Sequence, residues 1–202
     1  IASRGGGIIN SANLLNQTSE DELYEQSRIR LEEIMQQGTG AVEIKSGYGL
    51  TVEGELKMLR VIQRLKANYP IEIKATFLGA HAFPLEYKTN HSGYLKLLIN
   101  EMLPKIAAEN LADYIDAFLE TGYFSVSETI QIMEAGKKYN IKPGSPNNIE
   151  RVESGLFSWG NDMDVNTNAL ELPLEKFCQL DKSAEYLSRN ALHKIRSEGV
   201  TR

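Results

Sequence analysis

The chain has 202 residues, of which 42% are hydrophobic and 24% are charged, and its formal net charge is −5. This is an ordinary composition for a globular protein, long enough for one domain or two small ones. Acidic residues outnumber basic ones on both sides of Pro143, which argues against nucleic-acid binding. A single cysteine, Cys178, excludes an internal disulfide and favours a cytoplasmic location, where we expect it to be a small buried residue. No apolar run approaches the roughly 18 residues of a membrane span, and because Ile1 stands where methionine is usual, we expect the natural start to lie upstream.

The first 143 residues predict helices that alternate with strands. Capping boxes begin at Ser19 and Ser125, Thr51 can cap another helix, and Pro104 predicts a kink or an early helix end. The apolar periodicity predicts helices at 19–37, 51–69, 94–107 and 125–136, and strands at 41–46, 71–78, 112–119 and from residue 141. Such alternation argues for a parallel sheet with right-handed crossovers.

Four strands are half of an eight-stranded barrel, which takes about 250 residues. We therefore expect an α/β fold in which residues 1–143 form a partial (β/α)8 TIM-barrel fragment, about half the barrel. An open half-barrel leaves two unpaired sheet edges, and the expected partner contact is self-association through these exposed edges.

The pattern changes near Pro143. The turn-rich stretch 144–148 is the best boundary, so the expected domains are 1–143 and 144–202. Beyond the boundary we expect a strand at 149–157, a loop at 161–168 and a helix at 183–197. These elements together predict a small α+β fragment.

Two segments of the first domain place a polar ring after an apolar strand. Residues 40–50 read G-A-V-E-I-K-S-G-Y-G-L and residues 78–84 read L-G-A-H-A-F-P. Because α/β barrels carry their chemistry at the carboxyl ends of the strands, Tyr48 and His81 are the candidate site residues. The alternatives are a partly buried packing tyrosine and a histidine whose hydrogen bonds are satisfied within its loop. Glycines on both sides of Tyr48 would supply the backbone angles of the turn.

These segments resemble imidazolonepropionases, which are members of the amidohydrolase superfamily in histidine degradation. The resemblance also includes R-G-G-G-I at 4–8, E-L-K-M-L-R at 55–60 and E-M-L-P at 101–104, and it extends to about Pro143. It implies a metal-dependent hydrolase that opens the ring of 4-imidazolone-5-propanoate to N-formimidoyl-glutamate. It further implies that Tyr48 contacts the substrate and that His81 polarises the ring carbonyl or holds the carboxylate.

The resemblance implies zinc or iron, which would lower the pKa of a bound water from 15.7 towards about 7. The family holds its metal with an H-x-H pair, a later histidine and an aspartate. This chain has three histidines, His81, His91 and His193, and no H-x-H pair. We expect His91 to be solvated in a polar loop and His193 to lie on the surface of a helix. We therefore predict no metal ligands and no catalytic base in this chain.

Residues 144–202 resemble folate-dependent aminomethyltransferases and dimethylsulfoniopropionate demethylase. The resemblance is carried by G-S-P-N-N-I-E-R-V-E-S-G-L-F-S-W-G-N-D-M-D at 144–164 and N-A-L-E-L at 168–172. It implies that Glu153 binds the pterin of tetrahydrofolate, because a carboxylate accepts two N–H donors side by side, and that Trp159 lines the same pocket. The alternatives are a surface ion pair of Glu153 with Arg151 and a core position for Trp159.

Three hypotheses follow. The chain is an imidazolonepropionase-type hydrolase by lineage, expected to be inactive in this truncated form. Alternatively it is a folate-dependent transferase or demethylase fragment, or a non-functional chimera. A small molecule is the expected ligand in the first two, with no nucleic acid and no membrane.

Overall fold

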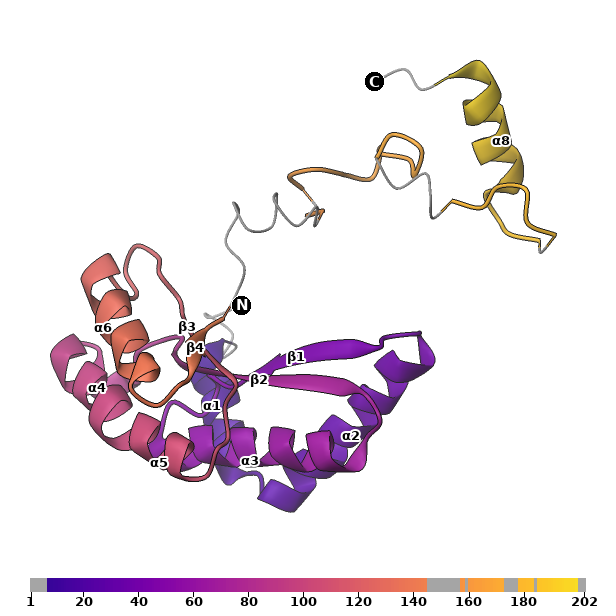
Figure 1. Ribbon diagram of the computed structural model, residues 1–202. Coiled ribbons are helices and arrows are strands. Elements are labelled where there is room, and N and C mark those ends of the chain that lie inside the picture. Colours follow the sequence, from indigo (N-terminus) through magenta and orange to yellow (C-terminus); the bar gives the residue numbers. More distant parts are fainter. Residues whose placement is uncertain (1–6, 145–156, 159, 173–177, 184, 200–202) are drawn as a thin grey trace. The chain divides into compact units, whose positions relative to one another are not determined.

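The computed structural model describes residues 7–144, 157–158, 160–172, 178–183 and 185–199 (Figure 1). The chain divides into two compact units, Ile1–Ser145 (unit 1) and Pro146–Arg202 (unit 2).

Unit 1 is built on a parallel sheet. Its strands are β1 (Ala41–Lys45), β2 (Glu72–Ala80), β3 (Tyr114–Ala117) and β4 (Lys142–Pro143), in the order β1-β2-β3-β4. Each strand pairs in parallel with the next strand in the sequence, with Val42 opposite Ile73 and Thr76 opposite Tyr114. The predicted α/β class with a parallel sheet is confirmed. The strand β2 runs two residues further than expected, through Ala80.

Two helices precede β1, and the other helices of unit 1 lie between successive strands. They are α1 (Ile8–Gln17), α2 (Glu20–Gln36), α3 (Val52–Asn68), α4 (His91–Leu97), α5 (Leu103–Ala108) and α6 (Val126–Lys137), with a 3-10 turn at Leu85–Tyr87 and a π turn at Leu98–Met102. The predicted caps are present: the hydroxyls of Ser19, Thr51 and Ser125 each accept a hydrogen bond from a backbone amide three residues on. Only Ser125 forms the full reciprocal capping box, with Glu128.

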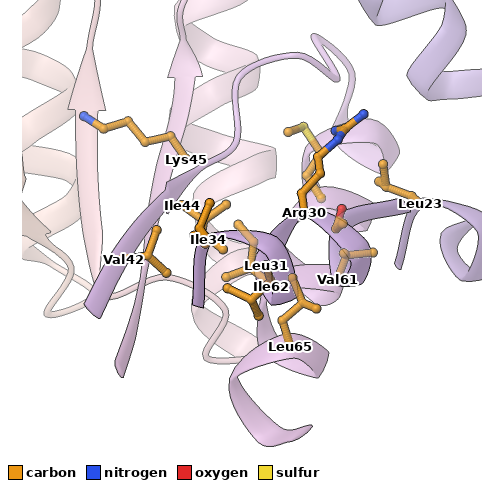
Figure 2. A pocket seen from close by; sticks show the side chains of 12 residues that line it. Leu23, Arg30, Leu31, Ile34, Val42, Ile44, Lys45, Val61, Ile62 and Leu65 are labelled. Atoms are coloured by element: carbon orange, nitrogen blue, oxygen red, sulfur yellow. The ribbon is translucent and has the colours of Figure 1, made fainter. Parts of the chain in front are cut away.

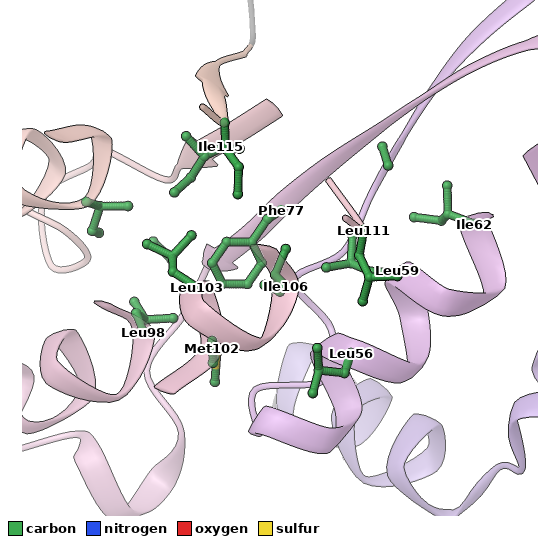
Figure 3. Close-up of a cluster of buried hydrophobic side chains, with 14 of the residues drawn as sticks. Leu56, Leu59, Ile62, Phe77, Leu98, Met102, Leu103, Ile106, Leu111 and Ile115 are labelled. Atoms are coloured by element: carbon green, nitrogen blue, oxygen red, sulfur yellow. The ribbon is translucent and has the colours of Figure 1, made fainter. Parts of the chain in front are cut away.

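The core lies between the sheet and the helices. The helix α3 buries the four side chains that its periodicity predicts as its inner face: Leu56, Leu59, Ile62 and Leu65. They form one cluster with Phe77 of β2 and with Met102 and Ile106 (Figure 3). Each fully buried side chain of this kind contributes roughly 1.5–3 kcal/mol. The helices α2, α3 and α5 lie on the same side of β1 and β2 (Figure 1).

Two parts of unit 1 differ from the prediction. The helix α1 was not predicted, because its sequence I-I-N-S-A-N-L-L-N-Q is rich in asparagine, a weak helix former. The helix expected at 94–107 starts earlier, at His91, because the side chain of Asn90 accepts a hydrogen bond from Gly93 and caps it. Pro104 does not end this helix. A π turn precedes Pro104, so the proline stands in the first turn of α5, where the helix needs no amide hydrogen from it. The helix then continues as α5.

The described residues of unit 2 form the helix α8 (Arg189–Glu198) and turns. The helix expected at 183–197 is present but starts later, at Arg189, and Leu187 before it is fully exposed. The Tyr186 hydroxyl donates to the Leu180 carbonyl instead (2.9 Å). Cys178 is half-buried rather than fully buried. Glu153, Trp159 and most of the predicted strand at 149–157 lie outside the described residues. Across the parts of the chain that are described, no helix is both long and apolar enough to cross a membrane.

Candidate functional site

The structure brings Tyr48 and His81 together. Tyr48 follows β1 and His81 follows β2, and the carboxyl ends of paired parallel strands lie at the same edge of a sheet. Their ring centroids are 5.1 Å apart with an interplanar angle of 82°, an edge-to-face contact. Tyr48 is 42% exposed.

The imidazole of His81 is oriented by the backbone of Gly47. The His81 Nδ1 atom lies 3.0 Å from the Gly47 carbonyl oxygen. Because a carbonyl oxygen only accepts, Nδ1 carries the hydrogen of this bond. In the neutral ring Nε2 then carries the lone pair, and Nε2 donates only when the ring is doubly protonated.

A buried carboxylate holds the loop of Tyr48. We call residues Ser46–Leu50 the Tyr48 loop. Glu55, in the first turn of α3, is 0% exposed, and its two oxygens accept hydrogen bonds from the amides of Gly47 (2.8 Å), Gly49 (2.8 Å) and Leu50 (3.0 Å). Burial raises the pKa of Glu55 and outweighs the opposing effect of these bonds and of the Ser46 hydroxyl.

Both glycines of the Tyr48 loop are required by space. Gly47 has φ +106°, and a Cβ there would lie 2.7 Å from the Leu78 carbonyl oxygen. A Cβ on Gly49 would lie 2.3 Å from the carbonyl carbon of Gly54. Tyr48 therefore lies between two positions at which any side chain would clash. Because both positions are glycine, the loop can pack closely against β2 and α3.

The helix α1 supports the outer side of the same loop. The Asn16 side-chain amide donates to the Gly49 carbonyl (2.9 Å), and Ala12 forms a small buried cluster with Leu50 and Ala82. The Lys57 ammonium of α3 donates to three carbonyls at the end of α1, those of residues 15, 16 and 18. The loop is thus fixed from two helices.

Two further aromatic residues, which the sequence analysis missed, extend the site. Phe118 directly follows β3 and contacts His81 edge-on, with centroids 6.0 Å apart. Tyr123 contacts Phe118 in turn, at 4.8 Å. Phe118 is 41% exposed and Tyr123 is 42% exposed. The signal was available, because Phe118 stands at the end of its strand just as His81 does.

A polar network also crosses the strands of the sheet. The Lys45 ammonium lies 2.8 Å from Asp116 and 3.6 Å from Glu43. The buried Thr76 hydroxyl donates to Glu43 (2.5 Å). Burial lowers the pKa of Lys45, but the two carboxylates reverse the direction and raise it, so Lys45 stays charged.

The described residues do not fit a metal ion. They include no group of three or more His, Cys, Asp or Glu side chains arranged to bind one. His91 was predicted to be solvated in a polar loop; it is instead the first residue of α4, and its side chain is 40% exposed. Its ring stacks on Phe83 (3.7 Å) and its Nδ1 atom lies 3.7 Å from Glu128. His193 lies on α8, with Nε2 3.0 Å from the Leu180 carbonyl oxygen.

A cavity of about 250 Å³ lies elsewhere, between α2, α3 and β1 (Figure 2). Its lining is mainly aliphatic and includes Leu31, Ile34, Val42, Ile44 and Val61. It contains none of the rings at the strand ends. It is therefore a gap in the helix layer beside β1, and it shares Lys45 with the polar network of the candidate site.

A parallel sheet with polar and aromatic side chains at the carboxyl ends of its strands has the arrangement in which α/β proteins bind small molecules. Two known enzymes are similar to this chain in sequence. Imidazolonepropionase from Flavobacterium psychrophilum is 77% identical to this chain over 143 residues, which are 71% of this chain and 35% of that protein. The enzyme of the same name from Flavobacterium johnsoniae is 64% identical over 160 residues, 77% of this chain and 39% of the relative. No family model matches the chain.

About 71% of the chain is thus homologous to imidazolonepropionase, as the sequence resemblance predicted. The chain spans little more than a third of the length of these curated relatives.

Proposed function

We propose that unit 1 is the substrate-contacting segment of an imidazolonepropionase-type hydrolase, which opens the ring of 4-imidazolone-5-propanoate to N-formimidoyl-glutamate. The observation that carries this proposal is the Tyr48–His81 pair at the ends of β1 and β2, in a chain 77% identical to an imidazolonepropionase over 143 residues. Four sequential parallel strands, with α2, α3 and α5 on one side of β1 and β2, are what a segment of a (β/α)8 barrel would present.

In this proposal Tyr48 and His81 form hydrogen bonds with the flat ring of the substrate or its side chain. The Tyr48 hydroxyl donates to or accepts from the ring edge. Because Nδ1 of His81 is engaged by Gly47, only Nε2 is left for the substrate. A neutral His81 accepts a ring N–H there, whereas a doubly protonated His81 donates to the ring carbonyl or to the propanoate.

The ring-opening chemistry needs more than the described residues hold. The family is metal-dependent, with zinc or iron expected from the resemblance, and the described side chains do not provide a metal site. We therefore propose that this chain binds the substrate and does not turn it over by itself.

The test is a titration of the full chain with imidazole-4-propanoate, an unreactive compound with the same ring size and side chain, followed by NMR. We expect the side-chain signals of Tyr48 and His81 to shift with a saturable dependence. Tyr48→Phe should weaken binding through the lost hydroxyl, and the matched control Tyr139→Phe, on an exposed tyrosine after α6, should not. Saturable binding that leaves both residues unperturbed would overturn the assignment. Turnover of 4-imidazolone-5-propanoate by the chain alone would overturn the proposed inactivity.

The second domain stays a separate prediction. We propose the boundary between 1–143 and 144–202, with tetrahydrofolate as the candidate ligand of the second part through Glu153. Tetrahydrofolate binding that Glu153→Gln abolishes would support a transferase-like fragment. No binding of either ligand would favour the non-functional chimera. Cytoplasmic location, based on the single Cys178, also stays a prediction.

We further propose that a second copy of the chain is a partner, through the sheet edge at β1. Within the described part of the chain β1 pairs only with β2, and the aliphatic cavity lies beside it. Sedimentation velocity should show a concentration-dependent dimer. Val42→Lys, which places a charge in that cavity, should shift the equilibrium to monomer, and a monomer at all concentrations would contradict the proposal.

A further inference from the structure

Glu55 is connected to both site residues through a single glycine. Its Oε2 atom accepts the Gly47 amide (2.8 Å), and the carbonyl of the same Gly47 accepts the His81 Nδ1–H (3.0 Å). Its Oε1 atom accepts the Gly49 amide (2.8 Å), on the other side of Tyr48. One buried carboxylate thus holds the amide of Gly47, the residue whose carbonyl orients His81, and the amide of Gly49 on the other side of Tyr48.

The carboxylate is itself stabilised by its helix and by a neighbouring hydroxyl, and it is buried. It lies in the first turn of α3, where the helix dipole favours a negative charge. The Ser46 hydroxyl, which donates to Glu55, accepts a hydrogen bond from the Leu78 amide of β2 (3.1 Å). Glu55 is 0% exposed, so water cannot replace it as the acceptor for the loop amides.

We propose that Glu55 is a positioning residue, which selects the Nδ1–H tautomer of His81 and sets the place of Tyr48, so that a ligand meets His81 only at Nε2. This inference rests on the proposed function for the identity of the ligand, and its geometry concerns the free protein. No atom of Glu55 needs to touch the substrate.

The first experiment reads the tautomer directly. In the full chain with ¹⁵N-labelled histidine, long-range ¹H–¹⁵N spectra at neutral pH should show His81 with hydrogen on Nδ1. Glu55→Gln keeps the size of the side chain but puts an N–H₂ group opposite the loop amides. We expect His81 to lose the single tautomer and to show the mixture of a free imidazole. Glu53→Gln is the matched control, because Glu53 is an exposed acid in the same turn of α3.

The second experiment needs no variant, and it applies even if Glu55→Gln does not fold. Hydrogen exchange of the wild-type chain should show the Gly47, Gly49 and Leu50 amides protected together, to the same degree as the amides of α3. Loop amides that exchange freely while α3 is protected would overturn the proposal. So would a Glu55→Gln variant that folds and keeps the Nδ1–H tautomer of His81.

Imidazole-4-propanoate separates this inference from the proposed function. Where Glu55 positions the site, Glu55→Gln should weaken binding on the order of tenfold, as the loss of an outer hydrogen-bond partner does for a metal ligand. A wild-type chain with the Glu55-dependent tautomer and no binding would refute the proposed function and leave the positioning role intact. Equal binding by the wild type and Glu55→Gln would refute the positioning role and leave the proposed function intact.

Discussion

Lys45 and Asp116 are 71 positions apart in the sequence, and their charged groups lie 2.8 Å apart. Lys45 ends β1 and Asp116 lies in β3, so the pair crosses over β2. Their side chains are 30% and 20% exposed. This ion pair joins the carboxyl ends of the first and third strands, and the residues Tyr48 and His81 follow the ends of the first and second strands.

Breaking this ion pair should destabilise unit 1. Lys45→Met leaves Asp116 half-buried without its cation, and we expect a loss of about 1–2 kcal/mol, between the values of exposed and buried pairs. Urea unfolding measures it. The control is Lys137→Met, which removes an ion pair with Glu134 whose side chains are 60% and 59% exposed, and which should cost less than about 0.5 kcal/mol. Equal losses in the two variants would contradict the role of Lys45.

Gly47 should tolerate no side chain. Gly47→Ala combines φ +106° with a contact of 2.7 Å to the Leu78 carbonyl oxygen, and we expect a loss of about 3 kcal/mol in the free energy of unfolding. Gly38→Ala is the control: its φ is +95°, but no atom lies within 4 Å of the added Cβ. That variant should lose only about 1 kcal/mol. If both alanines cost the same, the close approach of the Tyr48 loop to β2 is not as described.

The capping box of α6 should make stability depend on pH. The Ser125 amide and hydroxyl hold the pKa of Glu128 below its ordinary value of 4.5, with the amide bond the largest cause. A depressed folded pKa means that the stabilisation is present above 4.5 and is lost as the pH falls through the lower folded value.

Comparison of the wild type with Glu128→Gln by urea unfolding checks this. The difference should be about 1 kcal/mol at pH 7 and should shrink below pH 4.5. Ser19→Ala is the control. The Glu22 carboxylate accepts a hydrogen bond from Gln26 and does not close a box with Ser19, so the loss in this variant should not depend on pH in the same way. A Glu128 effect of the same size at pH 3 and pH 7 would rule out the box as its source.

Lys57 should hold the end of α1. Lys57→Met keeps the apolar stem and removes three hydrogen bonds to carbonyls, and we expect a loss of about 1 kcal/mol. Hydrogen exchange should then speed up in α1 more than in α3. Lys66→Met, on the same helix, removes an ion pair with Asp113 and should leave α1 unchanged. Unaltered protection of α1 in Lys57→Met would show that the contacts of α1 with the Tyr48 loop stabilise this helix without Lys57.

Local sequence signals sufficed for most of unit 1. The hydroxyl caps at Ser19, Thr51 and Ser125 and the inner face of α3 depend on residues close in sequence, and they were predicted correctly. Tyr48 and His81 could be chosen because each follows a strand. The role of these two residues in binding stays a prediction.

What the sequence could not show depends on contacts that form only when segments of the chain fold back on one another. The helix α1 is stabilised by Lys57, about forty positions further on, and not by its own propensity. The stacking of His91 on Phe83 needs the fold of the segment between β2 and α4. Glu55 looked like an ordinary acid in a first helical turn, because its three amide partners are reached only when the Tyr48 loop folds back.

The strands β1 to β4 pair in chain order and in parallel, so each pairing closes a crossover, as between Ala41 and Glu72. Parallel pairings across crossovers form slowly, but a growing chain can make them in the order of synthesis. The βαβ unit of β1, α3 and β2 contains the longest strand pairing and the Glu55 contacts, and it can form before β3 has been made. Tyr48 and His81 would then reach their mutual position during synthesis, ahead of the two-residue strand β4.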